Sequence, residues 1–313
     1  MATVGTADFE ALAAPHRTEL RAYCYRMLGS LADAEDALQE TLVAAWRGLA
    51  GFEHRASFRS WIYKIATHAC YRISGERPPR AVPYEAGPAA PGIDLDPMTE
   101  GPLWLEPYAD PVGERLEARE SVELAFVAAL QHLPATQRAA LVLSEVLGFS
   151  AAEVAELCET SVPSVNSALQ RARATVAERV PPMSQQASRR ALGDAGERAL
   201  CDRFVAAWAA QDVNALVALL TEDVKFSMPP IPTWFDGRPA VARFFAERVF
   251  ATPWRLVPIE ASGQLAFACY QGPDYRMGAL NVITLRGGAV CQTIGFLDPS
   301  LQAFFSLPAQ IDR

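Results

Sequence analysis

Residues Leu133–Arg173 have the sequence LPATQRAALVLSEVLGFSAAEVAELCETSVPSVNSALQRAR, and this stretch predicts three short helices joined by tight turns. The first helix should end at Gly148, because glycine adopts the left-handed backbone of a helix C-terminus most easily. Ser150 and Glu153 have the spacing of a capping box, which starts a second helix. A third helix follows within a few residues. The stretch therefore predicts a helix-turn-helix.

The third helix of this stretch has an apolar side and a polar side. It begins after Ser161, with Pro163 in its first turn, where the missing N–H of proline costs nothing. Its apolar residues recur at the spacing of a helix. They are Val165, Leu169, Ala172 and Val176. The other side suits a DNA groove, since short polar side chains can reach base edges and arginines can reach phosphates. Its residues are Ser164, Asn166, Ser167, Gln170, Arg171 and Arg173. A three-helix bundle with a solvated face would look similar, so the rest of the chain has to decide.

Charge is distributed unevenly along the 313 residues. Half of the residues are apolar, which is enough for several cores and predicts more than one domain. The net charge of −8 argues against a protein coated in nucleic acid. However, residues 55–80 hold six basic residues and one acid, whereas residues 81–117 hold eight acids and one base. A basic surface therefore remains available to phosphates just before an acidic segment.

The cysteines and the hydropathy pattern argue against several other classes. The six cysteines are scattered, without a CxxC pair or a spacing typical of zinc sites, so we expect free thiols and no metal. The sequence contains no glycine-rich phosphate loop and no HExxH motif. It also shows no signal peptide and no long apolar run, which predicts a cytoplasmic protein without a membrane segment.

Two patterned segments precede the acidic stretch. Residues 9–50 follow helical periodicity and predict helices at about 9–28 and 32–49, the second with acids in its first turns, where they complement the helix dipole. A solvated helix face is the equal alternative for those acids. Residues 52–74 interleave aromatic with basic residues, and this mixture suits single strands, because aromatic rings stack on bases while Arg and Lys follow the backbone. Some of these aromatics should instead be core.

Three motifs in this order resemble those of bacterial sigma factors of the extracytoplasmic-function group. They are DAEDALQETLVAAW at 33–46, FRSWIYKIATHACYR at 58–72, and the helix-turn-helix quoted above. In that family the first motif binds the β′ clamp of core RNA polymerase, the second opens and reads the −10 promoter element, and the third reads the −35 element. The resemblance covers about residues 9–78 and 115–180. It implies sigma region 2 at 6–78 and sigma region 4 at 115–180, with the β flap as another polymerase contact.

The resemblance also assigns roles to individual residues. The polymerase-binding residues are Asp33, Asp36, Gln39 and Trp46. The −10 residues are Arg59, Trp61, Lys64, His68, Tyr71 and Arg72. The −35 residues are Ser164, Val165, Asn166, Ser167, Gln170, Arg171 and Arg173. The sequence departs from the family at Asn166, where Lys is usual, and at Ala168, where Arg is frequent. His68 and Arg72 stand where Asn and Asp are common, so the promoter sequence does not follow from the resemblance.

Two linkers are predicted. The first is the segment 79–114, in which residues 81–113 hold seven prolines and most of the excess acid, and this composition favours an extended chain. In the family this connector threads polymerase channels that otherwise hold nucleic acid; a plain tether is the equal alternative for residues 81–99. Residues 103–108, LWLEPY, are apolar and aromatic and predict a docked segment. A second, polar linker is predicted at 181–196, after a proline-rich break.

Residues 197–313 change to an α+β pattern. Helices are predicted at 200–210, 213–220 and 239–250, and strands at 224–228, 264–270, 279–285 and 289–296, with Gly287-Gly288 as a hairpin turn. This order, and the stretch WFDGRPAVARFF at 234–245, resemble the SnoaL-like (cystatin-like) α+β cone. The expected fold is therefore multidomain, with two all-α domains followed by an α+β SnoaL-like domain.

Catalytic members of that cone use an acid, a histidine or a tyrosine in the cavity. Asp236, Asp274 and Tyr275 are the candidates here, but no histidine follows His132. A regulatory domain is the favoured interpretation, because a fold does not fix a function. We expect this domain to dock on the sigma domains near Trp234, Phe235, Asp236 and Arg238.

Three functions compete at this point: a sigma factor, a one-component ligand-responsive regulator, and a cyclase-like or isomerase-like enzyme fused to DNA-binding segments. A simple regulator needs one helix-turn-helix, whereas the acidic helix and the aromatic–basic stretch make sense only with polymerase and melted DNA. The sequence therefore predicts a non-enzymatic sigma factor that is monomeric when free. Its partners are core RNA polymerase and promoter DNA, without cofactor, metal or membrane; an anti-sigma partner does not follow from the sequence.

Overall fold

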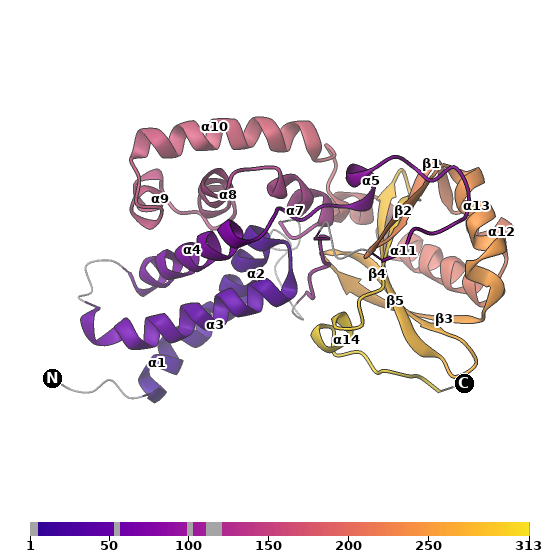
Figure 1. The fold of residues 1–313 in the computed structure, drawn as a ribbon, viewed down its shortest axis with the longest axis horizontal. Helices are drawn as coiled ribbons and strands as arrows, with labels where there is room; N and C mark the ends of the chain where they lie inside the picture. The colour runs from indigo at the N-terminus through magenta and orange to yellow at the C-terminus, as the bar shows by residue number, and fades with distance from the viewer. Residues whose placement is uncertain (1–5, 53–56, 99–102, 111–120, 313) are drawn as a thin grey trace. The chain divides into compact units, whose positions relative to one another are not determined.

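The computed structural model describes residues 6–52, 57–98, 103–110 and 121–312. The chain forms two compact units (Figure 1). Unit 1 combines Met1–Arg80 with Leu124–Pro182, and unit 2 combines Ala81–Glu123 with Met183–Arg313. The described part of the predicted 79–114 linker, from residue 81 onward, therefore belongs to the unit that contains the C-terminal domain.

The N-terminal helices of unit 1 are α1 (Thr6–Ala13), η1 (Ala14–His16), α2 (Arg17–Leu28), α3 (Leu31–Gly48), η2 (Leu49–Gly51) and α4 (Phe58–Glu76). Pro15 lies in η1 and divides the first predicted helix, because proline cannot donate the backbone hydrogen bond of a helix interior. Gly29 then ends α2 with a φ of 67°. Ser30 caps α3 by accepting a hydrogen bond from the N–H of Asp33.

The later helices of unit 1 are α7 (Leu124–Gln131), α8 (Ala135–Leu141), the π-helical turn η3 (Val142–Val146), α9 (Ala151–Leu157) and α10 (Val162–Arg179). Gly148 has a φ of 73° after η3. Ser150 and Glu153 form the complete capping box at the start of α9. These features confirm the predicted helix-turn-helix. Of the segment 115–180 predicted to form this domain, residues 115–120 lie outside the described part of the chain.

The two groups of helices pack on each other within unit 1. Helix α2 contacts α7, and α4 contacts both α8 and α9. The rings of Tyr63 on α4 and Phe149 before α9 meet edge to face, with centroids 5.3 Å apart. The two predicted all-α domains therefore share one compact unit.

Unit 2 is built on one six-stranded sheet with the order β2-β1-β6-β5-β4-β3. The strands are β1 (Leu220–Met228), β2 (Ile231–Asp236), β3 (Trp254–Ala261), β4 (Gln264–Gln271), β5 (Arg276–Arg286) and β6 (Ala289–Phe296). Only β1 and β6 are parallel among the strand pairs described. The helices are α5 (Pro83–Ala86), α11 (Gln185–Ala209), α12 (Val213–Val217), α13 (Arg238–Glu247), η4 (Val249–Ala251) and α14 (Leu301–Phe304). Side chains of α11, α12 and α13 share one apolar core with the sheet, which confirms the α+β expectation (Figure 1).

Two strands of this sheet were missing from the sequence prediction. They are β2 and β3, which form the two edges of the sheet. Pro232 interrupts the apolar pattern of β2, and Pro258 interrupts that of β3. Proline cannot donate to a ladder and is tolerated at an edge, so composition alone demotes these segments to loops.

The predicted linker is extended, and it is fastened to the C-terminal domain. Trp104 donates from Nε1 to the carbonyl of Pro230 at 3.1 Å. Tyr108 donates from its N–H to Oγ of Ser262 at 2.8 Å, and the N–H of Ser262 donates to the carbonyl of Tyr108 at the same distance. The side chains of Trp104, Leu105 and Tyr108 are buried, which confirms the predicted docked segment. The described residues 81–98 and 103–110 are called the strap below.

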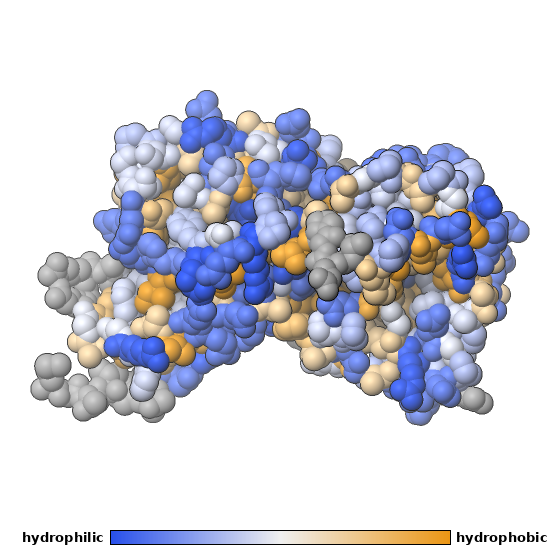
Figure 2. Space-filling view, in the orientation of Figure 1, coloured by the Kyte–Doolittle hydropathy of each residue, from blue (hydrophilic) through white to orange (hydrophobic). Residues whose placement is uncertain are grey.

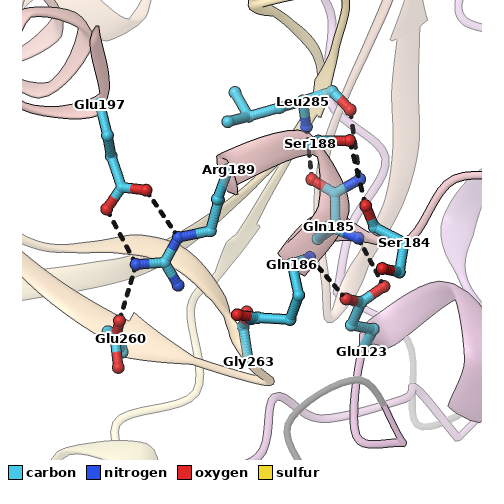
Figure 3. Close-up of polar contacts among 10 residues, drawn as sticks. All are labelled: Glu123, Ser184, Gln185, Gln186, Ser188, Arg189, Glu197, Glu260, Gly263 and Leu285. Carbon is cyan, nitrogen blue, oxygen red and sulfur yellow. Dashed lines mark hydrogen bonds and ion pairs between the residues drawn. The ribbon is translucent and has the colours of Figure 1, made fainter. Parts of the chain in front are cut away.

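The second predicted linker, 181–196, is also structured. Helix α11 begins at Gln185, with Gly193 at a φ of 70° marking a kink inside it. The carboxylate of Glu123 accepts the backbone N–H groups of Gln185 at 2.9 Å and Gln186 at 3.0 Å (Figure 3). Arg189 binds Glu197 and Glu260 with N–O distances of 2.8 and 2.7 Å. Polar composition predicted a linker here, but these polar groups are paired inside unit 2.

Candidate nucleic-acid interface

Helix α10 presents the predicted −35 residues on its exposed side. Ser161 caps the helix by accepting from the N–H of Ser164, and Pro163 lies in the first turn. Six of the seven predicted residues are exposed: Ser164, Asn166, Ser167, Gln170, Arg171 and Arg173. Val165 is the exception, because its side chain is 1% exposed and lies in the core. Its assignment to base contact is therefore corrected, and Val165 serves the apolar stripe alone.

The two arginines of this helix differ in their surroundings. Nε of Arg173 lies 2.5 Å from Oε1 of Glu145, a residue of η3. Arg171 is exposed and has no ion pair among the described residues. The surface over α10 is mainly hydrophilic (Figure 2). A phosphate would have to compete with Glu145 for Arg173, whereas Arg171 can bind one directly.

The predicted −10 residues all lie on α4, and Arg59 is the most enclosed by its partners. Its guanidinium donates to Glu19 of α2 at 3.2 Å and to the carbonyl of Leu147 at 3.0 Å. The guanidinium carbon also lies 4.2 Å from the ring centroid of Phe149. Leu147 and Phe149 belong to the helix-turn-helix, so the guanidinium of Arg59 is already bound by that part of the chain.

Three further −10 residues face the turn between α9 and α10. Lys64 lies 2.9 Å from the carboxylate of Glu159, and His68 lies 3.8 Å from the same carboxylate. The pKa of Glu159 is lowered, mainly by its hydrogen bond to Lys64. Tyr71 lies beside Cys158, and burial together with this thiol raises the pKa of Tyr71. Within unit 1, the helix-turn-helix thus covers much of the predicted −10 surface.

The remaining two −10 residues have different environments. Trp61 is half-buried and stacks on Phe52 with centroids 4.8 Å apart. Its ring would lie 3.2 Å from a Cβ placed on Gly48, a tight contact that would require the ring to shift by a few tenths of an ångström. Arg72 is exposed and pairs with Glu40 and Glu76. Trp61 therefore packs against its aromatic neighbours while remaining partly exposed, and Arg72 lies on the surface.

Helix α3 carries the predicted polymerase-binding residues, three of which share one face. Asp36, Gln39 and Trp46 are exposed, and Val43, which the sequence prediction missed, lies between them at helical spacing. Gln39, Val43 and Trp46 line a groove of about 420 Å³. Val43 and Trp46 are 45% and 51% exposed, which is unusual for large apolar side chains on a helix with a well-formed core. We name these four residues the α3 stripe.

Asp33 is the fourth predicted polymerase contact, and the structure places it inside unit 1. Its side chain is 4% exposed, and both carboxylate oxygens are paired, one with Arg77 and the other with Arg80 at 2.6 Å. Arg77 and Arg80 follow α4, so this acid fixes the end of that helix. The assignment of Asp33 to a surface contact is therefore corrected to an internal ion pair.

Comparison with known proteins agrees with this arrangement of helices and domains. Residues 12–73 match sigma-70 region 2, residues 123–176 match sigma-70 region 4, and residues 201–292 match the SnoaL-like domain. The chain is 40% identical over 315 residues to ECF RNA polymerase sigma factor SigG of Mycobacterium tuberculosis (strain ATCC 25618 / H37Rv). That match covers 96% of this chain and 84% of SigG. The chain belongs to the ECF sigma factor family.

Two other relatives describe the shared part and the shared fold. ECF RNA polymerase sigma factor SigM of M. tuberculosis is 30% identical over 169 residues, which is 54% of this sigma factor and 75% of SigM. The crystal structure of the M. tuberculosis extracytoplasmic function sigma factor SigJ has a TM-score of 0.61 at 23% identity, covering 97% of this chain and 100% of that one. SigJ therefore shares the fold of this sigma factor.

The C-terminal domain of the sigma factor places its four predicted contact residues differently from one another. Trp234 donates from Nε1 to the carbonyl of Gly87 at 2.9 Å, so it contacts the strap. Phe235 is fully buried and stacks on Phe244 with centroids 4.2 Å apart. Asp236 is exposed, and Arg238 pairs with Glu222. Phe235 is thus corrected from a surface contact to a core residue.

The predicted catalytic candidates are not gathered in a cavity. Asp236 ends β2 and Asp274 lies in the turn after β4, and both are exposed. Tyr275 is in that same turn, with the guanidinium of Arg255 4.6 Å from its ring centroid. Among the described residues of this domain, a cavity of about 10 Å³ lies between apolar side chains and Thr293, and none of the three candidates lines it. These positions do not bring an acid and a base together.

Among the described residues, no group of three His, Cys, Asp or Glu side chains could hold a metal ion. The six cysteines are free. None of the described helices combines the length and the apolar composition that a membrane crossing requires.

Proposed function

We propose that this sigma factor guides core RNA polymerase to promoters through three surfaces and that its C-terminal domain regulates it. The exposed side of α10 would read the −35 element, and α4 would bind the melted −10 strand. The α3 stripe would bind the β′ clamp, and sigma region 4 would bind the β flap. Because bacterial RNA polymerase acts in the cytoplasm, this chain would act there too.

Two properties of unit 1 support this assignment. The polar side chains of α10 are exposed at its N-terminal end, where short residues reach base edges. The α3 stripe places the exposed apolar side chains of Val43 and Trp46 in the lining of a groove, and exposed aromatic residues such as Trp46 are enriched in protein–protein interfaces. The pairs Arg59–Leu147 and Lys64–Glu159 imply a further step. These contacts must open before α4 can bind a DNA strand.

The observation that carries the regulatory part is the attachment of the strap to the C-terminal domain. The strap connects sigma region 2 to sigma region 4, so whatever holds it limits how far the two regions can separate. Trp104 and Tyr108 hold one end of the strap, on Pro230 and Ser262. At the other end Trp234 holds residues around Gly87.

The middle of the strap is held as well. The N–H of Ala90 donates to the carbonyl of Trp234 at 2.8 Å. The N–H of Asp96 donates to Oγ1 of Thr233, whose hydroxyl donates back to the Asp96 carboxylate, both at 2.8 Å. Tyr84 adds an edge-to-face contact with Trp234, with centroids 6.5 Å apart. We infer that the C-terminal domain restrains the linker in cis and thereby sets the rate of promoter opening.

The test measures run-off transcription by core polymerase together with one of three full-length sigma factors: wild type, Trp104→Ala or Leu95→Ala. The three rates are then compared. Leu95 lies in the same strap but is 40% exposed, so its variant is a matched control. We expect Trp104→Ala to change transcription several-fold and Leu95→Ala to leave it unchanged. Release of the strap is read separately, as faster cleavage after Glu85 by a glutamate-specific protease. Faster cleavage with unchanged transcription would reject the regulatory role while leaving the sigma assignment intact.

A further inference from the structure

Unit 1 contains a cavity of about 150 Å³ between its two groups of helices, and its lining includes both apolar and charged side chains. Asp33, Arg77 and Arg80 line it from the N-terminal helices and the residues that follow α4. Gln131 and Arg138 line it from α7 and α8. A single water needs roughly 10–15 Å³ by the same measure, so the cavity has room for a considerably larger molecule.

Arg138 is a buried cation whose hydrogen-bond partners are uncharged. Its side chain is 5% exposed, and it donates to the carbonyls of Met27 and Leu133 and to Oε1 of Gln131, the last two at 3.1 Å. These oxygens lie near the C-termini of α2 and α7, where the helix dipoles supply partial negative charge. Burial nevertheless lowers the pKa of Arg138 to about 10. None of the described hydrogen-bond partners of this guanidinium carries a negative charge.

Two buried donors of the cavity lining also lack partners. They are Nε of Arg138 and Nε2 of Gln131, and Gln131 is 4% exposed. A buried donor without an acceptor destabilises the folded protein, so each such group needs an explanation, such as a bound water or ion. Two of them on neighbouring residues of one cavity point to an acceptor-rich guest.

The charges of the lining specify the guest further. Three guanidinium groups, those of Arg77, Arg80 and Arg138, line the cavity with the single carboxylate of Asp33. Guanidinium groups bind phosphate oxygens in pairs, and a phosphate offers acceptors in three dimensions, whereas a carboxylate offers them in a plane. We propose that this cavity is a binding site for a phosphate group carried by a small molecule. The ligand is either free phosphate or a phosphate monoester.

The position of the site gives the ligand a structural effect. Its walls come from both sigma regions, so a bound phosphate contacts both and favours their packed arrangement. The same arrangement covers Arg59 and Lys64 of α4. Phosphate binding therefore opposes exposure of the predicted −10 surface. This effect does not depend on the strap.

The test is isothermal titration of the full-length chain with inorganic phosphate and, separately, with AMP, at constant ionic strength set with sodium chloride. We expect saturable binding of at least one of them at a single site. Similar affinities identify free phosphate as the ligand class, and a much tighter AMP complex identifies a phosphate ester. Arg77→Gln, whose side chain is half exposed and tolerates replacement, should weaken binding at least about tenfold.

Arg47→Gln is the matched control, because Arg47 is an exposed arginine of unit 1 outside the cavity. It should bind phosphate as wild type does. Arg138→Met removes the buried cation, and its circular dichroism spectrum establishes folding before titration; a folded variant should show no binding. The proposal is overturned if neither probe gives saturable heat. It is also overturned if Arg77→Gln and Arg47→Gln weaken the affinity for phosphate equally. A third contrary result is Arg77-dependent binding of a single-stranded oligonucleotide without binding of either small phosphate.

Discussion

Nζ of Lys64 on α4 lies 2.9 Å from the carboxylate of Glu159, which stands in the turn just before α10. This ion pair joins a predicted −10 residue to the helix-turn-helix. Both side chains are about half exposed, so the pair contributes little to stability. Its importance is that it occupies a cation that DNA would otherwise bind.

We predict that Glu159→Gln raises the affinity of the full-length chain for a single-stranded −10 oligonucleotide by about 1.5- to 5-fold. The expected gain is small because the ion pair that DNA no longer has to break is exposed and therefore weak. Fluorescence anisotropy at low salt measures the affinity. Glu156→Gln, an exposed acid on α9 with the same charge change, is the control. Equal gains for both variants would show that only net charge matters.

The second prediction concerns the α3 stripe. Asp36→Arg should weaken binding of core polymerase by on the order of 2–5 kcal/mol, because a charge reversal at an interface places like charges together. The thermal midpoint should stay near that of wild type, since Asp36 is exposed. A pull-down of core enzyme measures the loss, and Glu178→Arg on α10 controls for reversal of an exposed helix acid. Recovery at wild-type level would place the polymerase contact elsewhere.

The third prediction separates positioning from base reading on α10. Arg171→Ala should reduce the affinity for all −35 sequences alike and lower the salt dependence, because phosphate contacts are insensitive to sequence. Asn166→Lys should instead change which −35 sequence is preferred, by roughly 1–3 kcal/mol for each altered base contact. A binding series over −35 variants at several salt concentrations measures both effects. An unchanged ranking with Asn166→Lys would show that this residue does not face bases.

Local signals explain why so much of this fold could be predicted. Gly29, Gly148, Ser150 and Ser161 each end or begin a helix through their own backbone or side chain, so the sequence alone contains the information. The exposed side of α10 follows from the same periodicity. The two edge strands were missed because their prolines are allowed only by a position in the sheet, which no local pattern reveals.

Long-range pairing explains the residues whose predicted roles changed. Asp33 has the composition of a surface acid, but Arg77 and Arg80 return to it from more than forty residues away. Residues 181–196 have the composition of a linker, but Gln185 and Gln186 find a partner in Glu123. A polar residue can be buried only if the fold brings a hydrogen-bonding or charged partner to it. The local sequence does not show which distant residue provides that partner.

The last prediction concerns that partner. The chain leaves unit 2 after Glu123 to form the helix-turn-helix and returns to it at Met183, so the Glu123 carboxylate joins the two crossing points (Figure 3). It is 6% exposed and accepts two backbone N–H groups at the start of α11, which are charge-assisted bonds. Glu123→Gln can accept only one of them, so we expect a loss of about 1–3 kcal/mol and a thermal midpoint lower by several degrees. Calorimetry of the full-length chain measures this, with Asp202→Asn, an exposed acid of α11, as the isosteric control. Hydrogen exchange should localise the loosening to the N-terminal turn of α11; unchanged protection there would mean that Ser184 alone holds the helix start.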